Sequence, residues 1–468
     1  MMGPKNQEHD YTTAKAAALK LTKARFEAYI VGGAVRDIML DKQPKDFDLA
    51  TNAKPKQIKA LKGLGSALYK DTAQAYGVTR VKLRGKELEV ATFRRDVQAH
   101  LGRKHTRVKF TSLEEDVRRR DFTINALALD PLTNQIIDYV GGVDDIVNRR
   151  ICFIGDPLKR IYEDPLRVLR AIRFRNTLAF EYTPETSKAL QAAVRSGIIK
   201  TIAADRLCQE MTAMLSHNSR RSSLEDLDDY GILAQIVPEV VAGKGVKQPP
   251  QFHAEGDVWT HQLMVMESLP QNPSKQLTWA ALLHDIGKAK TQSLPKSAQD
   301  RIRFNKHSET GAHMAHKVLQ RLSFSKQDIK RICWIIYHHI NIDDLPSMRP
   351  SHQQAMLSHP AFADLFELHK VDAMASWYDN KPKPPPRFYQ IENLWRKFLS
   401  QTPQQRHPSL KRDLGIDGHW LQLQLGDELG LKPGPLLGQV LKSLEEDYRD
   451  KGVKTRSYYI DLARKLVS

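Results

Sequence analysis

The pattern of apolar and polar positions predicts a small sheet in the first third of the chain. Residues 29–40, "YIVGGAVRDIML", indicate a buried strand, a Gly-Gly turn and the start of a helix. Residues 79–94, "TRVKLRGKELEVATFR", alternate with a period of two, which predicts two strands joined by a turn at Arg84–Gly85–Lys86. Residues 118–130, "RRRDFTINALALD", begin with three arginines and an aspartate, and the apolar residues that follow predict a helix.

The rest of the chain shows helical periodicity. Apolar residues recur at helical spacing from about 157 to 235 and again from 258 to 345, where histidines stand among them. The run "KPKPPPR", residues 381–387, breaks this pattern and predicts the end of a domain. In residues 413–446 a Gly-Pro turn precedes an amphipathic helix. The pattern therefore predicts helices for most of the chain after residue 157.

Length and charge narrow the class of protein. A chain of 468 residues is too long for one core and predicts about three domains of roughly 150 residues each. The formal net charge of +18 and the pI of about 9.6 favour a polyanionic partner, with a membrane surface as the alternative. The chain starts with polar residues, has no run of about 18 apolar residues, and has three widely spaced cysteines. These features predict a cytoplasmic protein in a reducing compartment.

Two aspartates stand two positions apart in "KDFDLAT", residues 45–51. In a strand, Asp46 and Asp48 project from one face, where two carboxylates raise one pKa or require a counter-ion. Glu89 lies on a later predicted strand that could pair beside them. Three carboxylates beside a phosphate-binding turn make a site for two Mg²⁺ ions, which bind the attacking and leaving oxygens of a phosphoryl transfer. The alternative is a solvated strand end.

Glycines follow the first predicted strand. Gly32 and Gly33 let backbone N–H groups approach a phosphate, and the start of the next helix adds positive potential there. Arg36, one turn into that helix, could reach the same anion. A tight strand–helix turn without any ligand is the alternative explanation.

A basic segment carries Arg120 and Asp121 in front of apolar residues. One interpretation makes these two residues contacts to a triphosphate and a ribose. The alternative is that Asp121 caps a helix, with Thr123 nearby, while the arginines form a solvated basic face.

Another candidate pair lies in "EDPLRVLRAIRFR", residues 163–175, where Asp164 and Arg167 stand at i and i+3. An intrahelical salt bridge on one helical face is the first interpretation. The second is that a fixed Asp acceptor and a fixed Arg donor read the Watson–Crick edge of a base. Cytosine and adenine present an amino donor beside a ring-nitrogen acceptor and fit such a pair, whereas uracil and guanine present the opposite order.

The order of "GGAVRD", "DFDLAT", "EVATFR", "RRDFTINA", "DYVGGVDDI" and "EDPLRVLRAIRF" resembles the class II tRNA nucleotidyltransferases, the bacterial CCA-adding enzymes and poly(A) polymerases. The resemblance covers about residues 28–215. It implies an α+β fold in which a polymerase β-like nucleotidyltransferase head with a mixed sheet is followed by an all-helical neck, an HD domain and a helical tail.

The resemblance also implies roles for individual residues. Asp46 and Asp48 are then the catalytic pair that binds Mg²⁺, and Glu89 is the third strand carboxylate. The implied nucleotide-binding residues are Gly33, Arg36, Arg120, Asp121, Glu163, Asp164 and Arg167, and "ADRLCQEM", residues 204–211, supports the last three of these.

A flexible loop of the family corresponds to residues 95–107, "RDVQAHLGRKHTR", which have about the usual length but are more basic and lack the usual proline. A loop of this length resembles enzymes that add the terminal A, and it is unlike the shortened loop of CC-only enzymes. The altered composition leaves an A-adding specialist open. The loop is also shorter than in dedicated bacterial poly(A) polymerases.

A second set of candidate ligands lies in "WTHQ", "LLHDIGK" and "KHSETGA". This set mixes N and O donors, which favours a transition metal such as Ni, Mn or Co over Mg²⁺. The pattern resembles an HD phosphohydrolase domain over roughly residues 240–375. The candidate ligands are His261, His284, Asp285 and Asp372, with His307 and His339 for a second ion and His313 or His338 as weaker candidates. An HD fold kept for structure alone is the alternative.

Four domains are expected: a head over 1–150, a nucleotide-selecting and RNA-binding neck over 151–238, an HD domain over 239–380 and a tRNA-binding tail over 388–468. The resemblance implies template-independent addition of CCA, or its terminal A, to tRNA 3′ ends from CTP and ATP, with phosphohydrolase activity in the HD domain. A poly(A) polymerase and an RNA-binding HD phosphohydrolase are the alternatives. No membrane partner is expected, and the oligomeric state is left open.

Overall fold

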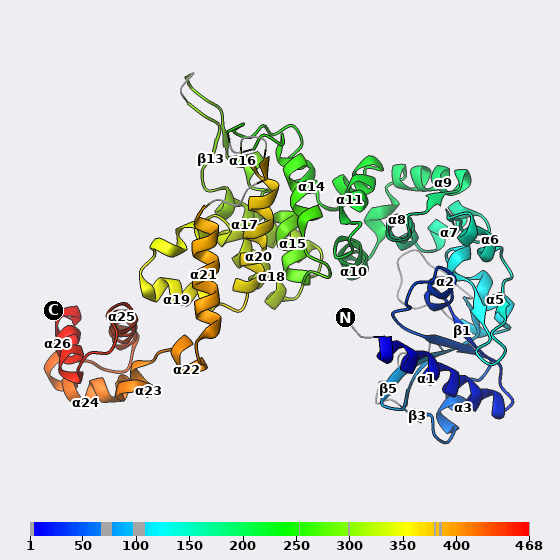
Figure 1. Cartoon of the computed structure of the whole chain (residues 1–468), viewed down its shortest axis with the longest axis horizontal. Coiled ribbons are helices and arrows are strands. Elements are labelled where there is room, and N and C mark those ends of the chain that lie inside the picture. Colours follow the sequence, from blue (N-terminus) through cyan, green and yellow to red (C-terminus); the bar gives the residue numbers. More distant parts are fainter. Residues whose placement is uncertain are drawn as a thin grey trace. The chain divides into compact units, whose positions relative to one another are not determined.

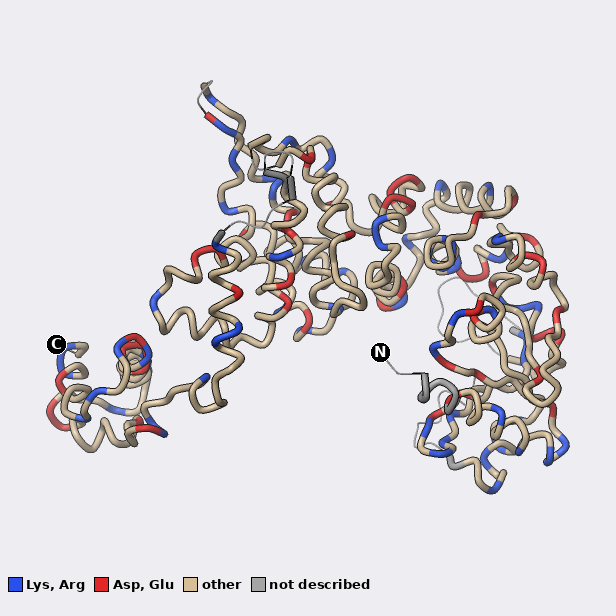
Figure 2. The backbone as a smooth tube through the Cα atoms, viewed as in Figure 1, with Lys and Arg blue, Asp and Glu red and all other residues tan. Residues whose placement is uncertain are grey.

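The computed structural model describes residues 4–66, 77–96, 108–251, 253–297, 300–378, 381–382 and 386–467. The chain divides into two compact units, Met1–Pro238 and Glu239–Ser468 (Figure 1). In Figure 2, Lys and Arg residues are spread along both units rather than gathered in one segment.

The first unit is built on a seven-stranded mixed sheet with the strand order β3-β4-β5-β2-β1-β8-β9. The pair β2–β5 is parallel, and the other neighbouring pairs are antiparallel. Helix α1 (Pro4–Lys23) packs against β1, β2 and β5. The strands are β1 (Ala28–Val31), β2 (Asp48–Thr51), β3 (Gly65–Ser66), β4 (Val78–Leu83), β5 (Lys86–Thr92), β8 (Ala128–Leu129) and β9 (Ile136–Ile137).

Two predictions for this sheet are confirmed. The segment 29–40 forms β1 and then helix α2 (Gly33–Met39). The segment 79–94 forms the hairpin β4–β5, in which Arg84 and Gly85 both have positive φ, 51° and 79°. Left-handed backbone at both turn positions matches the right-handed twist of the two strands. The α+β class with a mixed sheet in the head is therefore as predicted.

Two local predictions for this sheet are wrong. Strand β2 begins at Asp48, so Asp46 lies in the segment before the strand rather than two positions along it. Residues 118–130 form a short 3₁₀ turn, η1 (Thr123–Asn125), and then strand β8 instead of an apolar helix. A short apolar run fits a buried strand as well as a helix, and here pairing with β1 decides the outcome.

Shorter elements surround the sheet, and helices follow it, as the apolar spacing from 157 to 235 predicts. Strands β6 (Arg94–Asp96) and β7 (Val108–Phe110) pair at the two ends of the predicted flexible loop, whose residues 97–107 lie outside the described part. The other elements of this unit are α3 (Pro55–Ala60), α5 (Leu113–Arg118), α6 (Gly142–Val147), β10 (Arg150–Ile151), α7 (Pro157–Glu163), α8 (Leu166–Leu178), β11 (Glu181–Tyr182), α9 (Pro184–Arg195), η2 (Ile198–Thr201), α10 (Ala204–Leu215), α11 (Arg220–Asp229) and α12 (Leu233–Ile236), with α13 (Pro238–Val241) at the unit boundary.

The second unit is mainly helical. Its first helices, α14, α15, α18 and α20, pack on one another and bury residues such as Trp279 and Phe362. The predicted helical stretch 258–345 is interrupted by the hairpin β12–β13. The elements are α14 (Val258–Ser268), α15 (Lys275–Leu283), α16 (Lys288–Thr291), β12 (Gln292–Ser293), β13 (Arg303–Phe304), α17 (His307–Arg321), α18 (Lys326–His338), η3 (Asn341–Ser347), α19 (Pro350–Leu357) and α20 (Phe362–Ala375).

The C-terminal part of this unit has a core of its own. Leu421, Leu444 and Tyr459 are buried together there, and Pro435 starts helix α25 after the predicted Gly-Pro turn. The elements are β14 (Trp377–Tyr378), β15 (Lys381–Pro382), α21 (Pro386–Ser400), α22 (Pro403–Arg406), α23 (Leu410–Leu414), α24 (Gly418–Leu429), α25 (Pro435–Lys451) and α26 (Arg456–Val467).

Among the described residues, no helix combines the length and the apolar character that a membrane span needs. The predicted division into four domains is finer than the two units. It remains a prediction, and residues 383–385 of the breaker run lie outside the described part.

Candidate active site and candidate metal centre

The predicted carboxylates meet at one end of the parallel strand pair. Leu49 of β2 is level with Val90 of β5, and both are fully buried. Asp48 and Glu89, one residue earlier in each strand, therefore lie next to each other on the opposite face of the sheet. Glu89 forms an ion pair across the hairpin with Arg80, at 2.7 Å.

Electrostatics confirm that these carboxylates are close. Partial burial raises the pKa of Asp48 to about 6, the charges of Glu89 and Asp46 act in the same direction, and Arg120 opposes them. A carboxylate whose pKa is raised by burial and by two acidic neighbours belongs to a site that a hard divalent cation stabilises. The oxygen donors present here suit Mg²⁺.

A cavity of about 420 Å³ adjoins this site in the first unit. Asp48 lines it together with the turn glycines, and arginines outnumber acids around it, so that it favours an anionic ligand. The lining residues are Gly32, Gly33, Arg36, Asp48, Arg119, Arg120, Asp121, Asn125, Asp164, Arg167, Arg170 and Phe174.

Backbone conformation and limited space both favour glycine at position 32. Gly32 has a φ of +77°, and a Cβ atom there would lie 3.2 Å from Arg120 Nη1. Arg36 lines the cavity as predicted, but its guanidinium is already held. It donates to Asn125 Oδ1 at 2.6 Å and, through Nε and Nη2, to Asp37 Oδ1 at 2.9 and 2.6 Å. Arg36 is therefore a fixed positive charge at the edge of the cavity.

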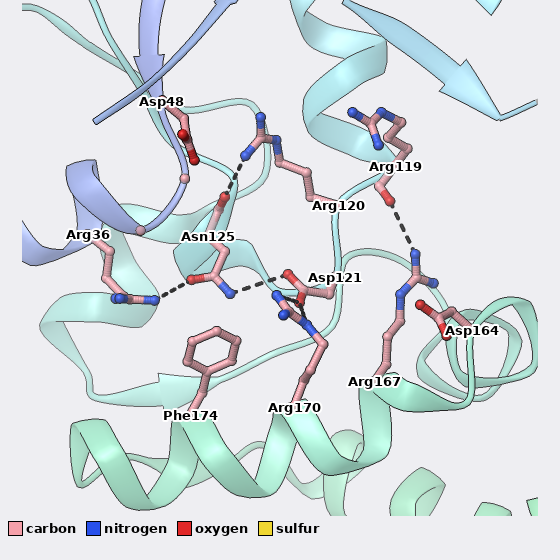
Figure 3. Close-up of a pocket in the computed structure, with 12 residues that line it drawn as sticks. Arg36, Asp48, Arg119, Arg120, Asp121, Asn125, Asp164, Arg167, Arg170 and Phe174 are labelled. Atoms are coloured by element: carbon pink, nitrogen blue, oxygen red, sulfur yellow. Dashed lines mark hydrogen bonds and ion pairs between the residues drawn. The ribbon is translucent and has the colours of Figure 1, made fainter. Parts of the chain in front are cut away.

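Asn125, which the sequence did not single out, connects several of the predicted residues. Its Oδ1 accepts from Arg36, its Nδ2 donates to Asp121 Oδ1 at 3.3 Å, and its backbone carbonyl accepts from Arg120 Nη1 at 3.3 Å. Figure 3 shows Asn125 between Arg36 and Asp121. Only 7% of this residue is exposed, and hydrogen bonds are electrostatically stronger in such a buried, low-dielectric environment.

Asp121 is buried in the site and accepts several hydrogen bonds that hold its neighbours in place. It accepts from the Phe122 backbone N–H at 2.8 Å and from Arg170 Nε and Nη2 at 2.7 and 2.6 Å. Burial alone would raise the pKa of Asp121, but Arg170 and the Phe122 N–H lower it. The helix-cap alternative is wrong, because the η1 turn starts after Phe122 without a side-chain cap.

Arg120 and Arg119 are held by a second buried acid, Asp116, which the sequence also did not single out. Asp116 accepts from Arg119 Nη2 at 2.8 Å and from Arg120 Nη2 at 3.3 Å. The basic face is thus partly an ordered wall of the cavity rather than a solvated surface.

The predicted base-reading pair lies at the opposite side of the same cavity. Asp164 has an extended backbone, φ −147° and ψ 99°, and stands between α7 and α8 rather than on one helical face. The reason is Pro165, because a proline disfavours helical backbone in the residue before it. Among the described ion pairs, Asp164 is joined to Arg206, at 2.8 Å, and not to Arg167.

Arg167 has different partners. It donates to Glu163 Oε2 at 3.1 Å, to the Arg160 carbonyl at 2.6 Å and to the Arg119 carbonyl at 3.3 Å. Asp164 and Arg167 are therefore fixed separately, and both border the cavity. The intrahelical salt bridge between them is not formed.

The segment 204–211 supports this side of the cavity, as the resemblance implies. It forms the start of α10, from which Arg206 holds both carboxylate oxygens of Asp164. Glu210, 9% exposed, accepts from Arg173 Nε at 2.7 Å and from Arg170 Nη1 at 3.4 Å. Helix α10 is thus joined through Arg170 to Asp121.

The second unit brings its predicted ligands together in its interior. Asp285 is 2% exposed, and its two oxygens face different histidines. Oδ2 lies 3.3 Å from His284 Nε2 and 3.8 Å from His261 Nε2. Oδ1 lies 3.6 Å from His307 Nε2 and 3.8 Å from His339 Nε2. These residues form two groups with metal-ligand geometry that share Asp285.

Asp372 completes the first group, with Oδ1 2.9 Å from His261 Nε2 and 3.9 Å from His284 Nε2. His313 is exposed, and the ring of His338 packs against Trp334. Neither belongs to a metal-ligand group among the described residues.

Unused nitrogen atoms indicate what this cluster binds. The Nε2 atoms of His284, His307 and His339 are buried and, within the described part of the chain, have no hydrogen-bond partner. The opposite nitrogen of each ring faces a carbonyl oxygen, which selects the tautomer whose Nε2 is free. The carbonyls belong to Ala281, Phe304 and Ile336, at 2.9, 2.8 and 2.6 Å. Buried imidazole nitrogens without partners fit a metal ion.

Two members of the cluster, His307 and Asp285, are already in the charge states that bind a metal ion. Burial alone would lower the pKa of His261, but hydrogen bonds to Asp372 and Glu255 raise it to about 9, so this ring must lose a proton to coordinate one. Burial, with His339 and Lys288 adding to it, lowers the pKa of His307 to about 4, so its ring is neutral at neutral pH. Burial alone would raise the pKa of Asp285, but His284 and Lys288 lower it well below its usual range. Neutral imidazole and ionised carboxylate are the forms that coordinate metals.

Glu255 was missed in the sequence. Its side chain accepts from His261 Nδ1 at 2.9 Å and lies 2.7 Å from His253 Nδ1. It therefore orients His261 toward the cluster. The only signal in the sequence was the group of three polar residues, His253, Glu255 and Asp257, just before α14.

Comparison with known proteins agrees with this geometry. Residues 28–152 match the family model described as "Poly A polymerase head domain", residues 179–243 the "Probable RNA and SrmB- binding site of polymerase A", and residues 258–363 the "HD domain". The last match covers much of the cluster around Asp285.

Relatives with names also match. The "Multifunctional CCA protein" of Xanthomonas campestris pv. campestris (strain B100) is 33% identical over 330 residues, 69% of this chain and 77% of the relative. The "CCA-adding enzyme" of Lactobacillus helveticus (strain DPC 4571) is 36% identical over 262 residues, 54% of this chain and 63% of the relative.

Among solved structures, the Bacillus stearothermophilus CCA-adding enzyme in complex with CTP has a TM-score of 0.69 at 23% identity, over 99% of this chain and 98% of that chain. At this identity the likeness is one of fold.

Proposed function

The chain belongs to the family of the multifunctional CCA proteins and CCA-adding enzymes, and we propose that it adds CCA, or its terminal A, to tRNA 3′ ends from CTP and ATP. The observation that carries this proposal is the meeting of Asp48 and Glu89 at the edge of a cavity with five arginines in its lining. Carboxylates beside a basic cavity are what a nucleotidyl transfer needs, because the triphosphate and the departing pyrophosphate are strongly anionic.

We assign the head residues as follows. Asp46 and Asp48 hold Mg²⁺, and Glu89 is the third carboxylate of the site. Bound Mg²⁺ supplies Lewis acidity that activates the primer 3′-hydroxyl and neutralises the triphosphate. Gly33, Arg36 and Arg120 bind the phosphates, and Asp121 holds Arg170 at the cavity wall. The basic surface of the chain, with a net charge of +18, supports tRNA as the partner.

Base selection is assigned to Glu163, Asp164 and Arg167. Both Asp164 and Arg167 border the cavity, and each is held by a partner other than the base, Arg206 and Glu163 respectively. A carboxylate offers about four lone-pair sites and a guanidinium five N–H groups, so both retain capacity for a base edge. An acceptor and a donor fixed in this way fit cytosine and adenine.

A second activity is favoured by the unused Nε2 atoms around Asp285. We propose that His261, His284, Asp285 and Asp372 hold one transition metal ion, that His307 and His339 add ligands for a second, and that the site hydrolyses small phosphoesters. A metal ion held by these residues would supply the Lewis acidity that such a hydrolysis needs. Lys288, 2.7 Å from Asp285, holds the carboxylate in place.

The location and the domain division follow from these assignments. We propose a cytoplasmic protein with a head over 1–150, a neck over 151–238, an HD domain over 239–380 and a tail over 388–468 that binds tRNA. The described helices include none suited to crossing a membrane.

The test uses tRNA transcripts that end before each of the three CCA positions, incubated with each nucleotide separately. CTP incorporation into the shortest transcript supports CCA addition. ATP incorporation alone, into the transcript that lacks only its final A, identifies an A-adding enzyme. ATP incorporation into any RNA identifies a poly(A) polymerase. No incorporation by a folded protein with metal-dependent hydrolysis favours an RNA-binding HD phosphohydrolase.

A further inference from the structure

Helix α18 in the second unit has an outer face that the metal cluster does not use. Its inner face is buried through four isoleucines, Ile329, Ile332, Ile335 and Ile336. The opposite face carries Lys330, Trp334 and Tyr337, which follow one another at helical spacing, and Tyr337 is 43% exposed.

Four aromatic rings form a continuous strip on this face, which we call the ring strip: Trp334, Tyr337, His338 and His359. Trp334 stacks on His359 with ring centroids 3.7 Å apart and 14° between the planes. Trp334 and His338 lie 4.6 Å apart, and Tyr337 and His338 lie 5.0 Å apart. The strip runs from the loop after α19 along the last turn of α18.

The His359 ring of the strip is held in place and is uncharged at neutral pH. The Ala361 backbone N–H donates to His359 Nδ1 at 3.2 Å and fixes that ring. Burial, and then the charges of Lys330 and Arg331, lower the pKa of His359. The His359 imidazole is therefore neutral, and it stacks on Trp334.

Positive charge beside the strip comes from Lys330 and Arg331. Within the described part of the chain, neither forms an ion pair. The acids nearest in this region are already bonded: Asp328 to Lys275 and Gln276, and Asp364 to Ser274. The charge of Arg331 also acts on Asp364, whereas Lys330 is exposed beside the stacked rings and available to an external anion.

We propose that the ring strip, with Lys330 and Arg331, binds an unpaired segment of RNA. Bases stack on the rings, and the phosphates between them lie against the two cations. From Trp334 to His338 the helix rises about 6 Å, which spans about two stacked bases. His339, the next residue, faces inward to Asp285, so the strip and the metal cluster lie on different faces of α18.

Binding of a short fluorescent oligoadenylate to the full chain, followed by anisotropy, tests this. Trp334→Ala is expected to weaken binding about tenfold, since one stacked base is lost, whereas Trp334→Phe retains most of it. Lys330→Glu is expected to weaken binding and to flatten its dependence on salt. Lys317→Ala, an exposed lysine on neighbouring α17, serves as the matched control and leaves binding unchanged.

Location is tested by photocrosslinking the same RNA, substituted with 4-thiouridine, and mapping the attached peptide. Crosslinks on α18 or at His359 support the strip. Tyr337→Ala removes an exposed ring and keeps the test valid if Trp334→Ala does not fold. Wild-type affinity in Tyr337→Ala and Lys330→Glu, or a protein dimer that these changes dissociate, would overturn the proposal. The result does not depend on nucleotide addition, because binding is measured directly.

Discussion

The two candidate centres differ in whether their polar side-chain atoms have partners within the protein. In the first unit, Arg36, Asp121 and Asp164 are held by protein partners around an open cavity of about 420 Å³. In the second unit, His284, His307 and His339 present buried nitrogens that no described residue satisfies. The first arrangement fixes charged side chains around an open cavity, whereas the second leaves buried donor atoms that a metal ion would satisfy.

The two centres also differ in the chemical type of the atoms that could bind a metal ion. The head offers carboxylates, and burial, together with the charges of Glu89 and Asp46, raises the pKa of Asp48 to about 6. The second unit offers imidazole and carboxylate together, and burial keeps the pKa of His307 at about 4. The first set suits Mg²⁺ and the second a transition metal, so we expect two chemistries that can be removed one at a time.

The largest effect is expected from Asp48→Ala. Nucleotide addition should fall by about 10³-fold or more, because a carboxylate of the metal site is lost and several kcal/mol of transition-state stabilisation go with it. Addition is measured with a tRNA transcript that lacks CCA, and tRNA binding and phosphoester hydrolysis serve as controls that persist. Addition within tenfold of wild type would remove Asp48 from the catalytic site.

The converse change is His284→Ala. Metal-dependent hydrolysis of 2′,3′-cyclic phosphates or phosphomonoesters should drop at least about 100-fold, because one ligand and its orientation are lost. It is measured with added Ni²⁺, Mn²⁺ or Co²⁺, beside His313→Ala, an exposed histidine of the same unit, as the matched control. Loss of nucleotide addition in a folded His284→Ala protein would show that the two centres are not independent.

A smaller effect concerns base choice. Arg167→Ala should relax the preference for CTP and ATP over UTP and GTP by about 10- to 100-fold, as expected for one lost base-edge contact. Misincorporation is compared with that of Arg221→Ala, an arginine on α11 outside the cavity lining. An Arg167→Ala enzyme that is slow but keeps full selectivity would make this arginine structural.

The smallest effect expected is a pH dependence from Asp48. Its raised pKa means that the ionised form, which holds the metal, is present above about pH 6 and is lost as the pH falls through that value. Below pH 6, addition at limiting Mg²⁺ should fall about tenfold per pH unit, and excess Mg²⁺ should move the midpoint lower. Rates that do not change between pH 7 and pH 5 would contradict the carboxylate cluster.

Local patterns in the sequence predicted strands and picked out candidate site residues, but they could not predict partners that are distant in the sequence. The strand–turn–helix at 29–40 and the hairpin at 79–94 follow from alternation and from glycines at turns. The helix predicted within 118–130 was wrong because only pairing with β1 decides how that short apolar run is buried.

The candidate site shows the same limit. The sequence identified Asp164 and Arg167 but not the partners that hold them. Arg206, which holds Asp164, lies 42 residues away, and Pro165 keeps Asp164 and Arg167 from sharing one helical face. The proline was a usable signal. Asn125 was missed because a single asparagine in an apolar run gives no pattern, although it joins Arg36 to Asp121.

Metal content tests the central claim of two separate centres most directly. Wild-type protein, Asp48→Ala and His284→Ala are dialysed against metal-free buffer after loading with Mn²⁺ or Ni²⁺, and the retained metal is counted by elemental analysis. The account predicts that wild type and Asp48→Ala retain a transition metal and that His284→Ala loses it. Equal retention in all three proteins, or loss in Asp48→Ala alone, would contradict the account.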